Sequence, residues 1–241
     1  MTRNLSHQQD SYKHQPGAND LHIWYICTNH EALPGDLSPL EACLSPQERH
    51  RYNSLQRPNS RQNFLISRGC LRYVLSFYLN CPPRALELSL GIHGKPELNP
   101  GGLYPPVQFN LSHTRERIAI ALHRDTPVGI DIERLKPLTH LEKLCQRCLT
   151  HQESETVLGL AIQPATHRFL RYWTAKEAVL KAMGLGLAYP MKHLEVFLGP
   201  EVLANQPSAA PIPVAFRSES APGMNQYWLY QWQPEKKQHV V

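Results

Sequence analysis

Residues 128–134 read VGIDIER, with two acidic residues in an otherwise apolar run. The alternation predicts a strand in which Asp131 and Glu133 project to the same face. Two neighbouring carboxylates repel each other, and a bound hard cation relieves that repulsion because carboxylate oxygens suit magnesium. An edge strand with one face in water explains the same pattern without a metal. These residues alone leave both interpretations open.

A helical stretch further along the chain, residues 171–187, reads RYWTAKEAVLKAMGLGL. On a helix Trp173, Glu177 and Lys181 are spaced four apart and share one face. A solvated Glu–Lys pair accounts for this spacing, but a large ring, an acid and a base on one stripe favour a buried site, where a carboxylate needs partners. If Glu177 faces the two acids of VGIDIER, the three form an oxygen-rich metal site with Lys181 ready for a phosphate.

Upstream of VGIDIER, residues 109–114 read FNLSHT and residues 94–96 read GKP. Ser112 and His113 at a strand end can donate hydrogen bonds to phosphate oxygens, and Lys95 on a glycine turn can reach one as a point charge. A Ser–His hydrolase is a poor interpretation. Adjacent residues on a strand point to opposite faces, and no nucleophile elbow surrounds the serine.

The expected elements follow the same order twice: strand, capped helix, long helix, strands. The first half contains strands at 21–28, 86–90, 107–111 and 117–123, a helix starting in a capping box at Ser45 and Glu48, and a helix over 60–79. The second half contains strands at 128–132, 194–198, near 214 and 227–232, a helix capped by Thr150 and Glu153, and a helix over 165–183. This order predicts an α+β fold of two halves meeting near residue 125, with a site in the cleft between them.

The expected organisation is a disordered leader over 1–20, an N-terminal α+β half over 21–125, a C-terminal α+β half over 126–233 and a flexible tail over 234–241. The formal net charge of +5 favours an anionic partner, which can be nucleic acid, an acidic protein or a phosphorylated small molecule. No apolar run reaches the roughly 18 residues of a membrane span, and the first twenty residues lack the apolar stretch of a signal peptide. We therefore expect a cytoplasmic protein with no membrane partner.

Cys145 and Cys148 form a C-x-x-C pair flanked by His140 and His151. Zinc is one interpretation of this spacing. The other is an amphipathic helix that buries both thiols, and we favour it because a structural zinc site usually shows two tight ligand pairs. The cysteines are accordingly expected to be free.

The motifs GKP, FNLSHT, VGIDIE and WTAKEAVLKAMGLGL, in this order and spacing, resemble those of the Sfp-type 4′-phosphopantetheinyl transferases. The resemblance runs from about residue 21 to 197 and is dense between 94 and 187. It implies a fold of two pseudosymmetric α+β halves with coenzyme A and magnesium in the cleft between them. It also implies the reaction, which moves the phosphopantetheine arm of coenzyme A onto a serine of an apo acyl or peptidyl carrier protein and releases 3′,5′-ADP.

The resemblance further implies roles for individual residues. Asp131, Glu133 and Glu177 are expected to bind the metal, which is magnesium or manganese, and Glu177 to take the serine proton directly or through a water. The expected coenzyme contacts are Lys95, Ser112, His113 and Lys181, together with Arg51 and Arg61 at its 3′-phosphoadenosine end. The alternative for the two arginines is a solvated helix face. Trp173 and Lys176 are expected to shape the cleft rather than take part in the chemistry.

Two rival functions remain at this point. A metal-dependent nuclease also combines acids, a lysine and a basic surface, but it typically places an acid and a lysine two apart on a strand, unlike Lys176, Glu177 and Lys181. A non-catalytic module that binds coenzyme A or a carrier protein is the second rival, and the three intact acids disfavour it. We expect a monomer that acts on a carrier protein and does not bind nucleic acid. The sequence does not specify a fatty-acid, polyketide or peptide-synthetase acceptor.

Overall fold

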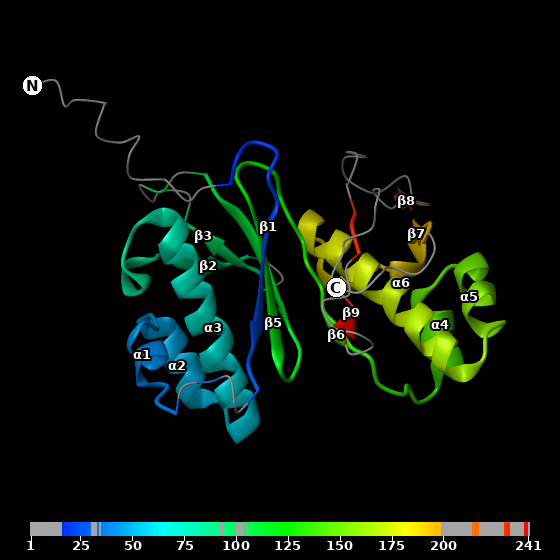
Figure 1. Cartoon of the computed structure of the whole chain (residues 1–241), viewed down its shortest axis with the longest axis horizontal. Coiled ribbons are helices and arrows are strands. Elements are labelled where there is room, and N and C mark those ends of the chain that lie inside the picture. The colour runs from blue at the N-terminus through cyan, green and yellow to red at the C-terminus, as the bar shows by residue number, and fades with distance from the viewer. Residues whose placement is uncertain are drawn as a thin grey trace, which may run out of the picture. The chain divides into compact units, whose positions relative to one another are not determined.

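A computed structural model of the chain describes residues 16–29, 33, 35–91, 94–99, 104, 106–198, 214–216, 229–231 and 239–240. The chain divides into two compact units, Met1–Pro127 and Val128–Val241, and Figure 1 labels the elements of both. Each unit combines helices with strands, which confirms the predicted α+β class. In the following description unit 1 and unit 2 denote these two parts of the chain.

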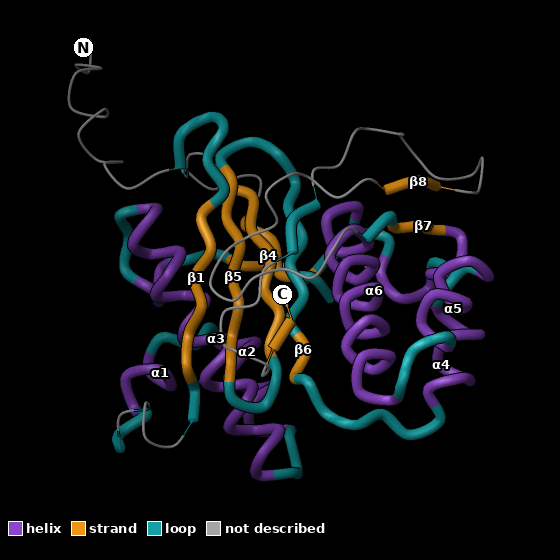
Figure 2. The backbone as a smooth tube through the Cα atoms, turned by 45° about the vertical axis from the view of Figure 1, so that its right-hand side comes forward, coloured by secondary structure: helices purple, strands orange, loops and turns teal. Residues whose placement is uncertain are grey.

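Unit 1 contains a three-stranded antiparallel sheet in the order β1-β5-β4. Its strands are β1 (His22–Cys27), β4 (Gln108–His113) and β5 (Arg117–His123), as predicted. β4 continues two residues past the predicted end, so it includes both residues of the Ser–His pair. Figure 2 shows the three strands side by side. In the register of β4 and β5, Ser112 lies opposite Ala119.

The helices of unit 1 are α1 (Ser38–Ala42), α2 (Pro46–Ser54) and α3 (Pro58–Leu79), followed by the 3-10 helix η3 (Pro83–Ala85). The capping box that begins α2 is present as predicted: Ser45 Oγ accepts a hydrogen bond from the Glu48 amide, and Glu48 Oε2 accepts one from the Ser45 amide. α3 packs an apolar face against β4 and β5, and this contact is the core of unit 1. The short helix α1 was not predicted, because it buries none of its side chains and so has no apolar periodicity.

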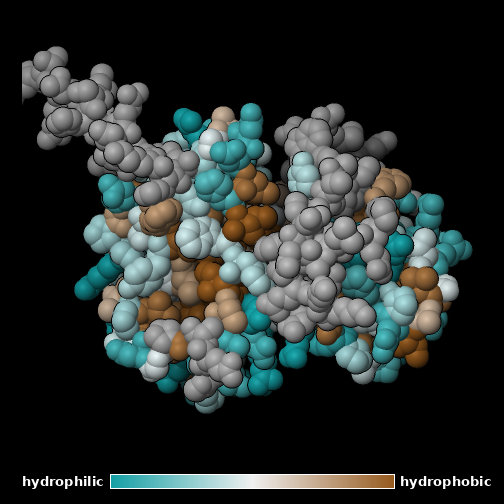
Figure 3. Space-filling view, viewed as in Figure 1, coloured by the Kyte–Doolittle hydropathy of each residue, from teal (hydrophilic) through white to brown (hydrophobic). Residues whose placement is uncertain are grey.

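Aromatic residues fasten the edge strand β1 to α3. The indole of Trp24 donates a hydrogen bond to the hydroxyl of Tyr78 at 2.9 Å, and its ring meets Phe77 edge-on at a centroid distance of 6.0 Å. Trp24 and Phe77 remain 37% and 46% exposed. The space-filling view also shows hydrophobic residues on the surface of unit 1 (Figure 3).

A short hairpin in unit 1 carries the GKP motif. β2 (Leu88–Leu90) pairs with β3 (Pro96–Leu98), and the Gly91 amide donates to the carbonyl of Lys95 at 2.8 Å. Gly94 has φ +77°, which a glycine adopts without the strain that a side chain would add. The glycine turn expected to carry Lys95 is therefore present, and β2 covers the last three residues of the strand predicted at 86–90.

The helices of unit 2 are α4 (Leu141–Cys148), α5 (His151–Leu158) and α6 (Ile162–Met183), and short elements follow: η4 (Gly186–Ala188), η5 (Met191–His193), β7 (Leu194–Val196) and β8 (Val214–Phe216). The capping box of Thr150 and Glu153 begins α5 as predicted. α6 begins three residues before its predicted start. Side chains of α4, α5, α6 and β7 form the core of this unit.

Residues 128–132, which alternation predicts as a strand, form none in the structure; this prediction is wrong. Only β6 (Glu133–Arg134) is a strand, and it pairs with β9 (His239–Val240). β9 therefore places two residues of the predicted flexible tail in a strand. Of the strand predicted at 227–232, Leu229 makes a single bridge, and the positions outside 229–231 are not among the described residues.

At the other end of the chain, residues 16–20 of the predicted disordered leader form a turn closed by two hydrogen bonds between Gly17 and Asp20. Residues 1–15 of that leader lie outside the described part. Cys145 and Cys148 are buried in α4 and carry free thiols, as predicted, and the other four cysteines are free as well.

Two buried ion pairs occupy matching places in the two units. Glu48 Oε2 accepts a hydrogen bond from the Ser45 amide, which caps α2, and another from Arg72 at 2.7 Å. Glu153 Oε2 likewise accepts one from the Thr150 amide, which caps α5, and another from Lys176 at 2.5 Å. Both cations are wholly buried, and each lies fourteen residues after the start of a 22-residue helix. Each also donates to the carbonyl of the first residue of a 3-10 helix further along its unit, Pro83 of η3 or Met191 of η5. The order of elements that the sequence repeats is thus a structural repeat down to these contacts.

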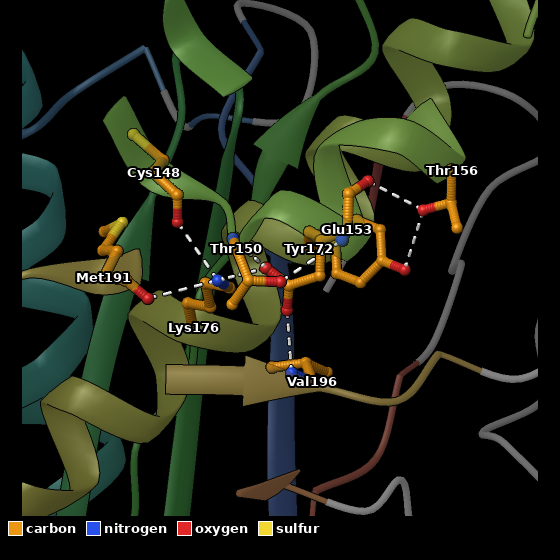
Figure 4. Close-up of polar contacts among 8 residues, drawn as sticks. All are labelled: Cys148, Thr150, Glu153, Thr156, Tyr172, Lys176, Met191 and Val196. Atoms are coloured by element: carbon orange, nitrogen blue, oxygen red, sulfur yellow. Dashed lines mark hydrogen bonds and ion pairs between the residues drawn. The ribbon is translucent and has the colours of Figure 1, made fainter. Parts of the chain in front are cut away.

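The pair in unit 2 connects five elements, α4, α5, α6, η5 and β7 (Figure 4). The three ammonium protons of Lys176 have three acceptors: Glu153, the Cys148 carbonyl and the Met191 carbonyl, the last two at 3.1 Å. The second carboxylate oxygen of Glu153 accepts from the amide of Val196 in β7 at 2.8 Å. Lys176 therefore holds these elements together, and the prediction that it shapes the cleft rather than taking part in the chemistry stays a prediction.

We expect Lys176→Met to destabilise the protein by about 3–5 kcal/mol, because it leaves Glu153 charged in the core without its cation. Urea unfolding followed by circular dichroism measures this loss. Lys176→Met combined with Glu153→Gln should recover part of it, since no unpaired charge then remains buried. Lys192→Met, which changes an exposed lysine, should stay within about 0.5 kcal/mol of the parent. Equal stability of Lys176→Met and the parent would contradict the assignment.

Candidate active site

Helix α6 places three of the predicted site residues on one face. Glu177 is 7% exposed, and the side chain of Lys181 is 27% exposed. Trp173 lies one turn before Glu177 and is partly buried against the core of unit 2. The helix ends at Gly184, which has φ +69° and so takes the left-handed conformation that closes a helix.

Residues 128–132 lie directly against α6, and Gly129 makes this approach possible. A Cβ at Gly129 would overlap the carbonyl oxygen of Ala178 and lie 2.5 Å from the amide nitrogen of Ala182. Ala178 and Ala182 have small side chains, so the segment can lie close to the helix backbone at these two positions. Ile130 and Ile132 are buried on the same segment, which fixes the chain on both sides of Asp131.

The close approach brings Asp131 to Lys181. The ammonium nitrogen of Lys181 lies 2.6 Å from Asp131 Oδ1 and donates to the Ile130 carbonyl at 3.2 Å. Asp131 itself is 6% exposed. The first acid of VGIDIER and the lysine of α6 are thus joined in a charge-assisted hydrogen bond.

The environment of Glu177 identifies it as the most perturbed acid of the group. Burial raises its pKa to about 7, and the negative charges of Asp131 and Glu133 add to this effect while Lys181 opposes it. An acid whose pKa lies near neutrality can hold or release a proton under ordinary conditions.

Glu133 belongs to the same group. Burial raises its pKa, and the charge of Asp131 raises it further; Lys136, Lys181 and a hydrogen bond from Trp173 act in the opposite direction. The structure therefore gathers the three predicted acids and Lys181 within unit 2, with Trp173 beside them. Asp131 and Glu133 thus lie near each other, as expected, although residues 128–132 are not paired in a strand.

The chemistry of this group suits a hard divalent cation, since it supplies carboxylate oxygens only. Across the residues that the structure describes, however, no three His, Cys, Asp or Glu side chains are arranged to hold a metal ion. The position next to Asp131 Oδ1 is taken by the ammonium group of Lys181. The three carboxylates are therefore of the right kind to bind magnesium, but in this structure Asp131 forms an ion pair with Lys181.

The predicted coenzyme contacts lie on separate elements of unit 1. Ser112 is buried and His113 is exposed at the end of β4, as expected for neighbours on a strand. Lys95 sits in the β2–β3 hairpin, where burial lowers its pKa and Glu97 partly offsets that effect. It lines a pocket of about 420 Å³ together with Tyr104.

The two arginines lie on the helices of unit 1. Arg61, in the first turns of α3, stacks over the ring of Tyr52 at 4.8 Å and lines a pocket of about 460 Å³. Its guanidinium also donates to Asn53 Oδ1 at 3.4 Å. Arg51 is exposed on α2. Arg61 is also exposed, so these contacts do not distinguish a coenzyme contact from the solvated helix face, and its role stays a prediction.

Comparison with known proteins relates the chain to the 4′-phosphopantetheinyl transferases. Residues 127–229 match the 4′-phosphopantetheinyl transferase superfamily. The chain is 34% identical over 183 residues to the 4′-phosphopantetheinyl transferase HetI of Nostoc sp., which covers 76% of each protein. It is 36% identical over 166 residues to a putative 4′-phosphopantetheinyl transferase of Synechocystis sp., covering 69% of this chain and 65% of that one.

A more distant relative is the human L-aminoadipate-semialdehyde dehydrogenase-phosphopantetheinyl transferase, 27% identical over 165 residues, or 65% of this chain and 53% of the human one. Buried acids with raised pKa values around a lysine are typical of an enzyme active site, so the site places the protein in the class of enzymes. Within that class the chain belongs to the 4′-phosphopantetheinyl transferase superfamily, whose enzymes transfer phosphopantetheine from coenzyme A onto carrier proteins. In the described part of the chain, no helix has the length and apolar character needed to cross a membrane.

Two features of the site escaped the sequence analysis. Gly129 was read as part of a strand, although a glycine in such a run signals a close approach of another backbone. The partnership of Lys176 with Glu153 was missed because a capping box accounts for the glutamate on its own.

Proposed function

We propose that this protein transfers the phosphopantetheine arm of coenzyme A to a serine of an apo carrier protein with magnesium bound by Asp131, Glu133 and Glu177. The observation that carries the proposal is the gathering of these three acids around Lys181 in the region matched by the transferase superfamily. Magnesium, when bound, neutralises the diphosphate and the charge that builds on the leaving oxygen.

The chemical step is a substitution at phosphorus. The serine oxygen bonds to the β-phosphorus of coenzyme A, the bond from that phosphorus to the bridging oxygen breaks, and 3′,5′-ADP leaves with that oxygen. We assign the serine proton to Glu177, directly or through a water, because its carboxylate is nearly buried beside Asp131, Glu133 and Lys181, where the metal and the diphosphate are proposed to bind. Lys181 contributes positive charge beside the phosphates.

The remaining contacts are proposed for the rest of the coenzyme. Lys95, Ser112 and His113 offer a cation and hydrogen-bond donors to phosphate oxygens, with His113 at the 3′-phosphate. Arg61 and Arg51 are assigned to the 3′-phosphoadenosine end. Both arginines are exposed, and the contact of Arg61 with the ring of Tyr52 at 4.8 Å supports its assignment.

Intact-mass spectrometry tests the reaction and its metal requirement together. An apo acyl carrier protein, incubated with this protein, coenzyme A and magnesium, should gain one phosphopantetheine group. The gain should disappear with EDTA and return when magnesium or manganese is added in excess. Transfer at full rate in EDTA would refute the metal requirement, and no transfer to any of several acyl and peptidyl carrier proteins would refute the proposed reaction.

We further propose that the active protein is a monomer, because all the proposed site residues occur in one chain. Size-exclusion chromatography with light scattering, run at assay concentrations, should give the mass of one 27.5 kDa chain. Activity confined to a larger species would contradict this.

A further inference from the structure

The strand β6 begins with Glu133, one of the three acids proposed to bind the metal. Within the described part of the chain its one strand partner is β9, and the register sets Glu133 opposite Val240 and Arg134 opposite His239. Figure 1 shows β6 and β9 side by side in unit 2. Two residues near the end of the sequence therefore lie next to an acid of the candidate site.

Residues 229–231, which precede β9, are fastened to helix α6. Leu229 is buried in the core of unit 2, and Gln231 is 1% exposed. The side chain of Gln231 accepts a hydrogen bond from Arg171 Nε at 2.9 Å and donates one to the Arg171 carbonyl at 2.6 Å. The C-terminal part of the chain is thus bound to α6, which carries Glu177, and to β6, which carries Glu133.

Asp131 and Glu133 are held in place by different contacts. Asp131 lies between two buried isoleucines, in a segment that approaches the α6 backbone closely at Gly129, and it contacts Lys181. Glu133 lies beyond this buried segment, and Leu135, which follows β6, is only partly buried against the core. The backbone pairing with β9 is the regular structure at Glu133 itself. Loss of β9 should therefore loosen Glu133 more than Asp131.

We propose that β9 is a positioning element of the metal site, which by pairing with β6 holds the Glu133 carboxylate ready for the ion. This inference rests on the function proposed above. A ligand that is already ordered costs no conformational entropy when the ion binds, whereas a mobile ligand must first be fixed. Groups that orient a metal ligand without touching the metal raise affinity in this way.

Manganese binding, followed by the electron paramagnetic resonance signal of the free ion, tests this role in the full-length protein. The double variant His239→Pro and Val240→Pro removes both amide protons of β9. Neighbouring residues of an antiparallel strand alternate in pointing their amides at the partner strand, so one of the two positions faces β6. We expect the proline variant to bind manganese about 10-fold more weakly than the parent, as is usual when a group that supports a metal ligand is lost.

The magnesium dependence of transfer supplies a second readout. In the proline variant, the magnesium concentration that gives half of the maximal rate should rise by about 10-fold, while kcat at saturating magnesium stays within about twofold of the parent. A loss of folded protein would lower kcat instead. In EDTA the variant should melt within about 4 °C of the parent, the shift that one weak contact produces in a protein of this size.

The matched control is the double variant His239→Ala and Val240→Ala, which keeps both backbone amides. It should bind manganese as the parent does. Equal loss of affinity in the alanine and proline variants overturns the inference, because the backbone pairing is then not the cause.

Hydrogen exchange of the parent decides the question if the proline variant does not fold. A Glu133 fixed by the ion also fixes its partner strand, so manganese should slow exchange at residues 133–134 and 239–240 together. Slowed exchange at 133–134 alone overturns the inference.

The remaining outcomes separate the inference from the proposed function. Equal manganese affinity of the folded proline variant and the parent, while the parent transfers phosphopantetheine with magnesium, overturns the role of β9 and leaves the function intact. Transfer by the parent that needs no divalent cation overturns the metal site and this inference with it. Weaker manganese binding by the folded proline variant alone, with the alanine variant unchanged, supports the positioning role.

Discussion

Replacement of Gly129 by alanine is expected to be among the most damaging single-methyl changes in this protein, costing about 3 kcal/mol or more of folding stability. The added Cβ would overlap the backbone of α6 at Ala178, and neither the helix nor the segment can rotate a side chain away. Relief requires moving residues 128–132 off the helix, which exposes Ile130 and Ile132 and separates Asp131 from Lys181. Urea unfolding measures the loss, and transfer activity should fall with it.

Gly35→Ala is the matched control for this substitution. A Cβ at Gly35 meets nothing within 4 Å, so its alanine variant should unfold within about 0.5 kcal/mol of the parent. If Gly129→Ala unfolds at the same urea concentration as Gly35→Ala, the close approach of residues 128–132 to α6 does not exist in solution.

For the VGIDIER segment, the sequence predicts correctly that Asp131 and Glu133 lie near Glu177 but wrongly that residues 128–132 form a strand. Alternation predicts a strand because residues two apart share a face in any extended chain. It does not show what lies beside that chain, and here the neighbour is a helix, not a strand. The acids still reach the site, because Gly129 rather than a strand partner determines where Asp131 lies.

Local signals predicted the helices well. The capping boxes at Ser45 and Thr150 depend on residues three apart, and both are formed. The stripe of Trp173, Glu177 and Lys181 depends only on helical spacing and is likewise present.

Contacts between distant residues were not predictable in this way. Glu48 and Arg72 lie 24 residues apart, and Glu153 and Lys176 lie 23 apart. No periodic pattern records such a pairing, since it depends on how helices pack. The pairing of β6 with β9 is more distant still, and β9 is too short for its residues to read as a strand.

Glu177→Gln is expected to reduce phosphopantetheine transfer by about 10²–10⁴-fold while the protein stays folded. The amide has nearly the shape of the carboxylate, but it carries no charge for a metal and cannot accept the serine proton. In the parent, burial and the neighbouring acids disfavour the ionised form of Glu177. The neutral variant at pH 8 in EDTA should therefore be at least as resistant to urea as the parent, so the loss of activity cannot be attributed to unfolding.

Kinetics at saturating magnesium then separate the two roles assigned to Glu177. Loss of kcat that persists when calorimetry shows the metal fully bound supports a role in proton transfer as well as in metal binding. Glu142→Gln, which changes an exposed glutamate on α4, controls for the loss of one negative charge from unit 2 and should retain full activity. Normal turnover by Glu177→Gln at saturating magnesium would rule out Glu177 as the base. The attacking serine would then have to lose its proton to water or to another group, while the assignment of Asp131 and Glu133 to the metal would be unaffected.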